Sequence, residues 1–454
     1  MSLAKAAKVL GGSLIGADRH FAGVSTDTRT LQPGELFVAL KGPNYDGHDF
    51  LAQAAHASAA GAMLVNLAET PLPAIQVEDA RHALGSLAAF WRQQFDIPVI
   101  AITGSNGKTT VKEMTAAIMA ETGPGCSTKG NLNNDIGVPL TLLRLRPGDR
   151  YAVVELGMNQ RGEIHYLSAI TRPTVAVITN ATEAHLAGLG TVEDVARAKG
   201  EIFSALAADG VAVINADDDY TELWRELATP KRCVTFGLHR GADVTADYET
   251  ETMGSLVHIK TTKGDIDMRL PVLGKHNVAN ALTATATSLA AGAELQHVKR
   301  GLEKLRQISG RLEVKAGVNG SRIIDDTYNA NPASLAAGIA VLKDFPGEAV
   351  LVLGDMAELG EAAPDIHRRT GELAKSLGIS RLFAVGALSK LAVESFGEDG
   401  MHFSSRRALV ETLLGHLHTD VTVLIKGSRI MRLEYVVQKV TQPNAMDTRE
   451  VTTR

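Results

Sequence analysis

Cysteine is scarce in this sequence, and its scarcity excludes several kinds of protein. The 454 residues contain only two cysteines, Cys126 and Cys233. Two cysteines cannot build a disulfide framework or a multi-cysteine zinc site, and so low a count is typical of a reducing compartment.

Long apolar runs and an excess of positive charge are also missing. No run approaches the roughly 20 apolar residues that a membrane-spanning helix needs. Residues 1–21 predict a short amphipathic helix followed by a polar strand, without the unbroken apolar core of a signal peptide. The net charge is -5, so the basic stripe of a nucleic-acid-binding protein is not indicated. We therefore expect a cytoplasmic protein with no membrane span and no nucleic-acid partner.

The chain is too long for a single hydrophobic core, and its patterns divide it into three α/β regions. Hydrophobic residues make up 45% of the sequence and charged residues 21%, which is typical of a globular protein. Short apolar runs that alternate with helical periodicity predict parallel sheets covered on both faces. Only residues 242–272 alternate in the manner of a small antiparallel sheet. We predict a small N-terminal α/β domain (1–82), a central parallel-sheet domain with that antiparallel addition (83–311) and a Rossmann-like C-terminal α/β domain (312–454).

The strands expected in these domains are short apolar runs next to turn residues or helices. Residues 50–60 and 80–95 have helical spacing, and the second of these helices is expected to lead into the central domain. The expected strands are 36–40 and 61–65 in the first domain, 98–104, 151–157, 174–180 and 210–217 in the second, and 322–326, 349–355, 381–386 and 421–427 in the third.

The strongest chemical signal is the segment ITGSNGKTT, which follows an apolar strand and opens a helix. Backbone N–H groups in such a turn point into one concavity, and the helix N-terminus adds partial positive charge, so the turn suits phosphate. The general phosphate-loop pattern has a glycine six residues before the lysine, where this chain has Ile102. A glycine-rich turn that binds nothing is the alternative. The residues expected to bind ATP here are Gly104, Ser105, Asn106, Gly107, Lys108, Thr109 and Thr110.

This loop resembles the nucleotide loop of the Mur ligases and folylpolyglutamate synthases, in which the same shorter form occurs. Further resemblances to the Mur ligases follow in order along nearly the whole chain. They are STDTR (25–29), ALKGPNYDGHDF (39–50), NLNNDIGVP (131–139), VVELGMN (153–159), NATEAHL (180–186), AKGEIF (198–203), GKHNVANAL (274–282), SGR (309–311), DDTYNANP (325–332), LGDMAELG (353–360) and IKGSR (425–429).

The resemblance implies an ATP-dependent ligase of cell-wall precursor synthesis. Within the family, the motifs look like those of members that add D-alanyl-D-alanine to UDP-N-acetylmuramoyl-tripeptide through an acyl phosphate. The first domain would bind the UDP end of the substrate, the second ATP and the third the dipeptide. Closure of the third domain would exclude water from the acyl phosphate. The expected cofactor is Mg²⁺, and a monomer is expected.

The reaction brings two anionic groups together, so positive charge must lie between them. Lys108 is expected to supply part of it, and Thr109 to ligate Mg²⁺. The resemblance makes Glu155 and His185 further metal ligands, and it implies that Lys199 is carbamylated, which turns a cation into an anionic ligand. From the residues alone, two alternatives remain: His185 as an ordinary surface-loop histidine and Lys199 as a lysine that faces solvent.

Other residues are expected to hold the nucleotide at the edge of the second domain. Asn side chains both donate and accept, which suits an adenine edge, but helix capping by Asn277 is an alternative. Arg311 is expected to contact phosphate, or else to form an interdomain salt bridge, and Asp326 to accept from ribose. The remaining nucleotide-binding residues expected are His276 and Asn280.

The expected substrate-binding residues are polar side chains in loops that match family motifs. Each set has an ordinary alternative: turn chemistry in the first domain, an Asx turn near Asn133, a turn rich in Asn and Pro near Tyr328, and solvated charge in IKGSR. The set comprises Ser25, Thr26, Asp27, Arg29, Asn44, Asp46, His48, Asn131, Asn133, Asn134, Asn159, Tyr328, Asn329, Asn331, Lys426 and Arg429.

Three rival functions remain at this point. A sibling ligase would add a single amino acid, or glutamate to folate, although STDTR resembles a UDP-binding module. A nucleotide-binding regulator would bind ATP or GTP without amine-dependent turnover. A nucleic-acid-stimulated ATPase is disfavoured by the acidic balance. The sequence does not distinguish diaminopimelate from lysine as the third peptide residue.

Overall fold

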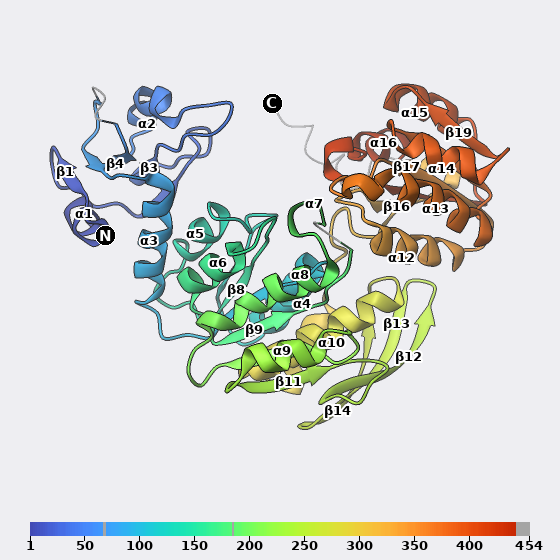
Figure 1. Cartoon of the computed structure of the whole chain (residues 1–454), viewed down its shortest axis with the longest axis horizontal. Helices are drawn as coiled ribbons and strands as arrows, with labels where there is room; N and C mark the ends of the chain where they lie inside the picture. The colour runs from blue at the N-terminus through green and yellow to red at the C-terminus, as the bar shows by residue number, and fades with distance from the viewer. Residues whose placement is uncertain (67–69, 184–185, 442–454) are drawn as a thin grey trace, which may run out of the picture.

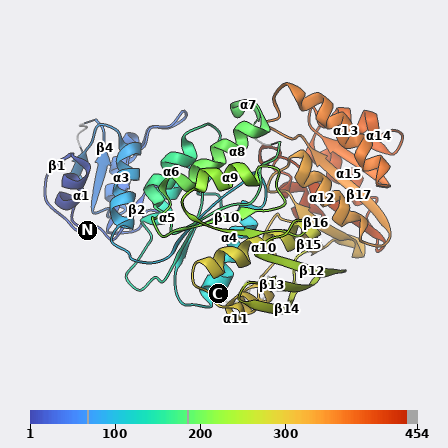
Figure 2. The ribbon, with the colours of Figure 1, turned by 60° about the horizontal axis from the view of Figure 1, so that its bottom comes forward.

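The computed structural model describes residues 1–66, 70–183 and 186–441 and folds them into three α/β units that follow one another along the chain (Figure 1). Each unit has its own sheet, of five, nine and six strands. The central unit lies between the other two in both ribbon views (Figure 2). The predicted fold class is confirmed. None of the described helices is both long and apolar enough to cross a membrane, and both cysteines are free thiols.

The N-terminal unit is a five-stranded sheet in the order β1-β5-β4-β3-β2. Only β1 runs antiparallel, paired with β5. The strands expected at 36–40 and 61–65 are present, and so is the helix expected at 50–60. The elements are α1 (Leu3–Leu10), β1 (Ser13–Ile15), β2 (Gly23–Ser25), β3 (Glu35–Val38), η1 (Gly47–Phe50), α2 (Leu51–His56), β4 (Gly61–Leu64) and β5 (Ala74–Gln76).

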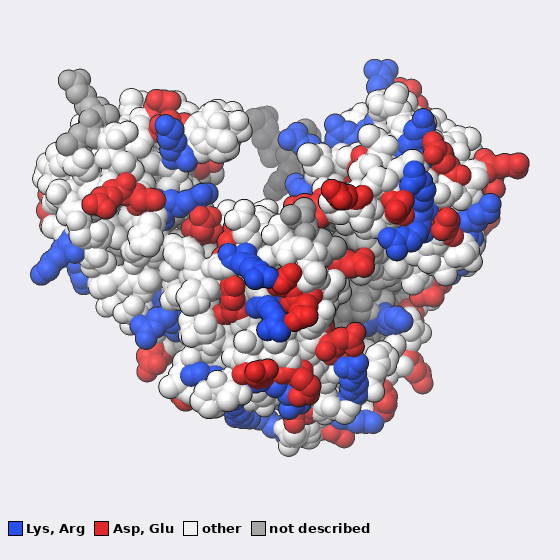
Figure 3. Space-filling view, viewed as in Figure 1, with Lys and Arg blue, Asp and Glu red and all other residues white. Residues whose placement is uncertain are grey.

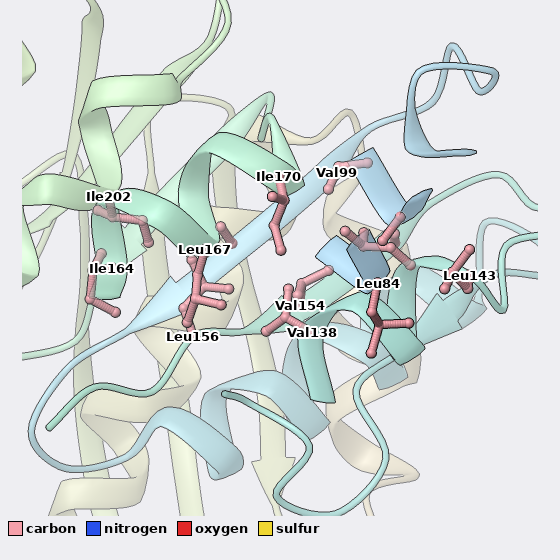
Figure 4. Close-up of a cluster of buried hydrophobic side chains, with 14 of the residues drawn as sticks. Leu84, Val99, Val138, Leu143, Val154, Leu156, Ile164, Leu167, Ile170 and Ile202 are labelled. Atoms are coloured by element: carbon pink, nitrogen blue, oxygen red, sulfur yellow. The ribbon is translucent and has the colours of Figure 1, made fainter. Parts of the chain in front are cut away.

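Helix α3 (Ala80–Arg92) fastens this unit to the central one. The Asp79 side chain caps it by accepting from the backbone N–H groups of Arg81 and His82. At its other end the Arg92 guanidinium donates to the carbonyls of Thr171 and Arg172 in the central unit. Its apolar face, which includes Leu84, packs into a cluster with Val138, Leu167 and Ile170, shown in Figure 4. The N-terminal end of α3 lies against α6, where the ring centres of His82 and Tyr166 are 6.4 Å apart.

The central sheet is parallel from β6 to β11, in the order β11-β10-β9-β6-β8-β7. Alternate residues of its strands belong to different cores: Val99 and Ala101 of β6 to one, Ile100 and Ile102 to the other. Both faces are therefore buried, which explains the unbroken apolar runs. The strands are β6 (Val99–Thr103), β7 (Cys126–Ser127), β8 (Ala152–Glu155), β9 (Val175–Ile178), β10 (Val211–Asn215) and β11 (Arg232–Phe236).

The antiparallel strands predicted in 242–272 do not form a separate sheet. Phe236 pairs with Val244, so the antiparallel strands extend the parallel sheet at its edge. These strands are β12 (Val244–Glu251), β13 (Gly254–Thr261) and β14 (Gly264–Leu270). The helices of the unit are α4 (Lys108–Ala120), α5 (Gly137–Leu142), α6 (Glu163–Thr171), α7 (Leu186–Leu189), α8 (Val192–Gly200), η2 (Glu201–Ala205), α9 (Thr221–Ala228), α10 (Lys275–Ala290) and α11 (Leu295–Glu303).

The C-terminal unit has the sheet order β15-β16-β20-β17-β18-β19, parallel except for β15. The carboxyl ends of β16, β20 and β17 lie side by side, where open α/β sheets build their sites. The strands are β15 (Glu313–Ala316), β16 (Arg322–Asp326), β17 (Glu348–Gly354), β18 (Arg381–Val385), β19 (Gly400–Phe403) and β20 (Val421–Lys426). The helices are η3 (Val318–Gly320), α12 (Pro332–Lys343), η4 (Gly360–Ala362), α13 (Ala363–Ser376), α14 (Ser389–Phe396), α15 (Arg406–Leu414), η5 (Arg429–Met431) and α16 (Glu434–Val440).

The surface carries acidic and basic side chains intermingled over the face seen in Figure 3. The same view shows the molecule hollowed between its N-terminal and C-terminal units, above the central one.

Candidate active site

The glycine turn between β6 and α4 has no room for larger residues. Gly104 has φ +151° and Gly107 has φ +81°, a region that side chains disfavour. A Cβ on Gly104 would lie 1.8 Å from Thr179 Oγ1, and one on Gly107 2.5 Å from Asn280 Oδ1. The turn is also fastened to the end of β9, because the Ser105 N–H donates to the Asn180 carbonyl over 2.9 Å. The loop is a rigid concavity at the N-terminus of α4.

Two cavities open on this turn. The large cavity has a volume of about 1010 Å³ and is lined from all three units, by α3 residues such as His82, by Glu155 of β8 and by Arg429 of the third unit. The small pocket, of about 320 Å³, lies between α10 and the third unit and is lined by His276, Asn277, Asn280 and Asp326, among others. Asn106, Gly107 and Arg311 line both, so the phosphate loop forms the boundary between them.

Lys108, the residue after Gly107, lines the large cavity. Its ammonium donates to the carbonyls of Gly104 and Ser105 over 2.6 and 3.2 Å. Burial lowers its pKa, and the nearby Glu155 carboxylate partly opposes that shift. A cation held at the centre of the loop suits the β- and γ-phosphates of a bound nucleotide.

Glu155, which lines the large cavity, and Lys199, which is not among its lining residues, are both buried, each 1% exposed. Glu155 accepts from the Asn133 amide over 2.8 Å through Oε1, while Oε2 has no hydrogen-bond partner among the described residues. Burial holds the pKa of Lys199 well below its usual value, and the positive charge of Lys108 adds to the shift. The solvent-facing alternative for Lys199 is therefore wrong.

The residues at this place fit a divalent cation. A buried carboxylate oxygen without a partner is costly unless a ligand completes it, and Mg²⁺ prefers oxygen donors. Thr109, the next residue after Lys108, is 8% exposed. A lysine with a lowered pKa is more often a free amine, the form that reacts with CO₂. Among the described residues no three or more His, Cys, Asp or Glu are grouped so that they could hold a metal ion, and His185 lies outside the described residues.

The small pocket is framed by the first turns of α10. The Asn277 amide donates to the Leu273 carbonyl over 2.7 Å, and the Asn280 amide donates to Asn277 Oδ1 over 2.9 Å. Gly274, without any side-chain hydrogen bond, is the N-cap of the helix, so the capping alternative for Asn277 is wrong. Burial lowers the pKa of His276 to about 4, with Lys426 and Lys275 adding to the shift, so its ring is neutral near pH 7.

Asp326 and Lys426 form a buried ion pair in the wall of the small pocket. Their charged atoms lie 2.6 Å apart, and the ammonium also donates to the Asn329 carbonyl over 2.9 Å. Burial raises the pKa of Asp326 and lowers that of Lys426. Lys426 is not among the residues that line the large cavity. The solvated-charge alternative for Lys426 is wrong, because it is 1% exposed.

Arg311 bridges the second and third units. Its guanidinium stacks 4.0 Å from the ring centre of Tyr328 and donates to Thr109 Oγ1 over 3.4 Å. Its Nε is buried without a hydrogen-bond partner among the described residues. Within that part of the chain it forms no ion pair, so its donors point to an anion at the phosphate loop.

The third unit makes a second contact with the loop through Asn331. This residue caps α12 by accepting from the Ser334 N–H over 2.9 Å, and its amide donates to Asn106 Oδ1 over 2.7 Å. Asn133, Asn134, Asn159, Tyr328, Asn329 and Arg429 also line the large cavity, whereas Asn131 does not. Asn134 accepts from the Ile136 N–H over 3.3 Å, the pattern of an Asx turn, and from the Gly137 N–H over 2.9 Å.

The residues expected in the first domain lie outside both cavities. Asp27 pairs with the Arg29 guanidinium, with a shortest separation of 2.6 Å, and accepts from it through both oxygens. Asp46 accepts from the His48 ring over 2.6 Å and caps η1. The remaining expected residues of these loops, Ser25, Thr26 and Asn44, are likewise absent from the lining of either cavity.

Several lining residues escaped the sequence patterns. Asp79, Arg81, His82 and Tyr166 line the large cavity because α3 packs against α6. Thr179 and Asn180 line the small pocket, and their place directly after β9 was the available signal. Ile430 lines the large cavity beside Arg429.

Fold and site together define the class as a three-domain α/β ligase built around a phosphate loop. Three models of the Mur ligase family match the chain: the family's catalytic domain over residues 20–92, its middle domain over 102–288 and its glutamate ligase domain over 310–429. The chain belongs to the Mur ligase family.

Named relatives cover nearly the whole chain. The UDP-N-acetylmuramoyl-tripeptide–D-alanyl-D-alanine ligase of Escherichia coli (strain K12) is 44% identical over 96% of this chain and 98% of its own length. A crystal structure of MurF from Acinetobacter baumannii superposes with a TM-score of 0.90 at 35% identity, covering 96% of this chain and 97% of that one. A structure of MurF from Thermotoga maritima in complex with ADP has a TM-score of 0.80 at 26% identity, covering 92% and 96%.

Proposed function

We propose that this chain joins D-alanyl-D-alanine to UDP-N-acetylmuramoyl-tripeptide with cleavage of ATP, a step of peptidoglycan precursor synthesis. The observation that carries the proposal is the large cavity, in which side chains of all three units meet at one phosphate loop. A ligase that joins two substrates while it cleaves ATP needs such a junction. Similarity to the E. coli ligase over 96% of the chain supports the choice of substrates.

The nucleotide binds with its adenine in the small pocket and its phosphates on the loop. Asn277 and Asn280 face the base, Asp326 the ribose, and Lys108 the β- and γ-phosphates. Because Lys426 belongs to the wall of this pocket, it holds Asp326 in place on the nucleotide side. Arg311 adds positive charge at the γ-phosphate as the third unit closes on the second.

Thr109, Glu155, His185 and the carbamate of Lys199 would hold Mg²⁺, which would neutralise charge between the two anionic reactants. The Lys199 amine adds to CO₂ and loses a proton to form that carbamate. Its burial favours this reaction because the free amine is the nucleophile.

The reaction proceeds in two steps. The tripeptide carboxylate attacks the γ-phosphate, the bond to ADP breaks, and an acyl phosphate forms. The dipeptide amine then attacks the acyl carbon, loses a proton and expels inorganic phosphate, leaving the pentapeptide. Lys108 and Arg311 hold the oxygens on which charge builds up. Burial of the site against the third unit keeps water from the acyl phosphate.

The proposal extends to domain roles and setting. We assign 1–82 to the UDP end, 83–311 to ATP and 312–454 to the dipeptide. The loops around Asp27 and Asp46 supply the UDP contacts from outside the large cavity. We place the protein in the cytoplasm, since free cysteines and an ATP substrate suit a reducing compartment. We also propose that it is a monomer.

Phosphate release tests the proposal directly. It should require ATP, Mg²⁺, the UDP-tripeptide and D-alanyl-D-alanine together, and the product should gain the mass of the dipeptide. Single amino acids, offered with the shorter UDP-peptides, test for a sibling ligase. Turnover without the dipeptide, or with nucleic acid in its place, would contradict the assignment.

A further inference from the structure

Ile430 is the most exposed large hydrophobic residue in the described part of the chain, at 78%. Exposed apolar residues scattered singly over a surface are ordinary. Ile430 differs from them in position, because it lines the large cavity that contains the phosphate loop. An apolar side chain in the wall of a polar reaction cavity calls for a ligand with an apolar group.

The turn that carries Ile430 is held firmly. The Ser428 hydroxyl and N–H both donate to the Asp355 carbonyl, over 2.6 and 3.0 Å. On the other side the Arg406 guanidinium donates to the carbonyls of Met431 and Arg432, over 3.3 and 3.0 Å. Isoleucine is also restricted at χ1, since it branches at Cβ. The side chain is therefore presented at a defined place in the cavity wall.

The cavity wall that includes Ile430 combines the guanidinium of Arg429 with apolar groups and the carboxylate of Glu358. Arg429, the preceding residue, has a side chain 65% exposed and lies 3.5 Å from Glu434, a separation at which the pairing is weak. Ala357 and Leu359, from the loop after β17, line the same cavity. A guanidinium beside a short apolar surface complements a small apolar amino acid with a free carboxylate. The C-terminal residue of D-alanyl-D-alanine has this chemistry.

We propose that Ile430 packs against the methyl group of the C-terminal D-alanine and thereby selects the dipeptide, while Arg429 pairs with its carboxylate. This inference rests on the proposed function. Ile430 acts as a specificity residue: it does not touch the reacting atoms, and it favours a C-terminal residue with a methyl side chain over glycine.

A cycle of residue and substrate truncation tests the contact. We compare wild type and Ile430→Ala with D-alanyl-D-alanine and with D-alanyl-glycine, which lacks the methyl group in question. Removing the contact should lower kcat/KM for D-alanyl-D-alanine about 5-fold, as expected for a few methyl-sized contacts in a half-open site. The effect should appear in KM for the dipeptide. With D-alanyl-glycine, wild type and variant should differ by less than about 2-fold.

Equal losses with both dipeptides would overturn the inference, and so would a fall in kcat with unchanged KM for the dipeptide. The latter pattern would mean that Ile430 acts in domain closure. Leu414→Ala is the matched control, because Leu414 is an exposed apolar residue of the same unit outside both cavities. It should leave every constant unchanged. Thermal melting of both variants verifies the fold.

The same experiment separates this inference from the proposed function. If wild type releases no phosphate with either dipeptide, the proposed function fails. If wild type turns over D-alanyl-D-alanine but the variant discriminates between the two dipeptides as wild type does, only the role of Ile430 fails.

Discussion

Removing one charge of the buried Asp326–Lys426 pair should destabilise the third unit strongly. Lys426→Met keeps most of the side-chain volume but leaves Asp326, 6% exposed, without its partner at 2.6 Å. The Asn329 carbonyl loses its donor as well. Breaking a buried pair by removing one partner costs about 3–5 kcal/mol, because an uncompensated charge remains in a poorly hydrated site. We expect a loss of that size in the free energy of unfolding.

The double variant Lys426→Met with Asp326→Asn separates this cause from general damage. With no charge left to bury, the penalty should fall to about 1–2 kcal/mol, since neutral replacements of buried pairs are tolerated. Asp326→Asn alone should be nearly as harmful as Lys426→Met, because it leaves the ammonium unpaired. Each charge then depends on the other for its stability in the buried site. This agrees with the pKa shifts, because burial raises the pKa of Asp326 and lowers that of Lys426.

Hydrogen exchange is the suitable assay, read on peptides that cover β16 and β20. Tryptophan fluorescence would report on other parts of the protein, because Trp91 lies in α3 and Trp224 in α9, both outside the third unit. Protection of β16 and β20 should fall in Lys426→Met and return in the double variant, with the central sheet unchanged. A single variant within about 1 kcal/mol of wild type, or a double variant no better than the single one, would refute the reasoning.

Three further predictions concern the site. Glu155→Gln should reduce phosphate release about 100-fold or more at an unchanged melting temperature, since a neutral amide oxygen holds Mg²⁺ more weakly than a carboxylate does; near-normal turnover would count against the metal site. Asn331→Ser should keep the cap of α12 but lose the 2.7 Å hydrogen bond to Asn106. A hydrogen bond worth about 1 kcal/mol implies that KM for ATP rises about 5-fold. Lost hydrogen-exchange protection in α12 would show a capping defect instead. His276→Gln should flatten the acid branch of the stability curve. The folded pKa of about 4 lies below the ordinary 6.5, so wild type loses stability as pH falls between these values, and equal slopes in both melting series would contradict this.

Much of the fold follows from local patterns. Strands such as 98–104 and 349–355 are apolar throughout because both faces of a parallel sheet are covered, and β6 and β17 lie there as predicted. The phosphate loop was equally predictable, because a turn without room for side chains at Gly104 and Gly107 requires glycine at both positions. The antiparallel strands were recognisable by their alternation, but their attachment to β11 depends on a single pair, Phe236 with Val244.

The sequence by itself determined the chemistry: a phosphate loop, a buried-strand carboxylate at Glu155 and loops rich in amides and charge. Tertiary structure alone decided which of these share a cavity. It brought Asn331 onto Asn106, drew Lys426 into the small pocket beside Asp326 and left Asp27 and Arg29 paired with each other. The reason is physical. The pattern of residue types along the chain reflects the local backbone and its burial, so it can be read from the sequence. Which residues hundreds of positions apart become neighbours depends instead on how α3 and the strand ends of the three sheets pack together.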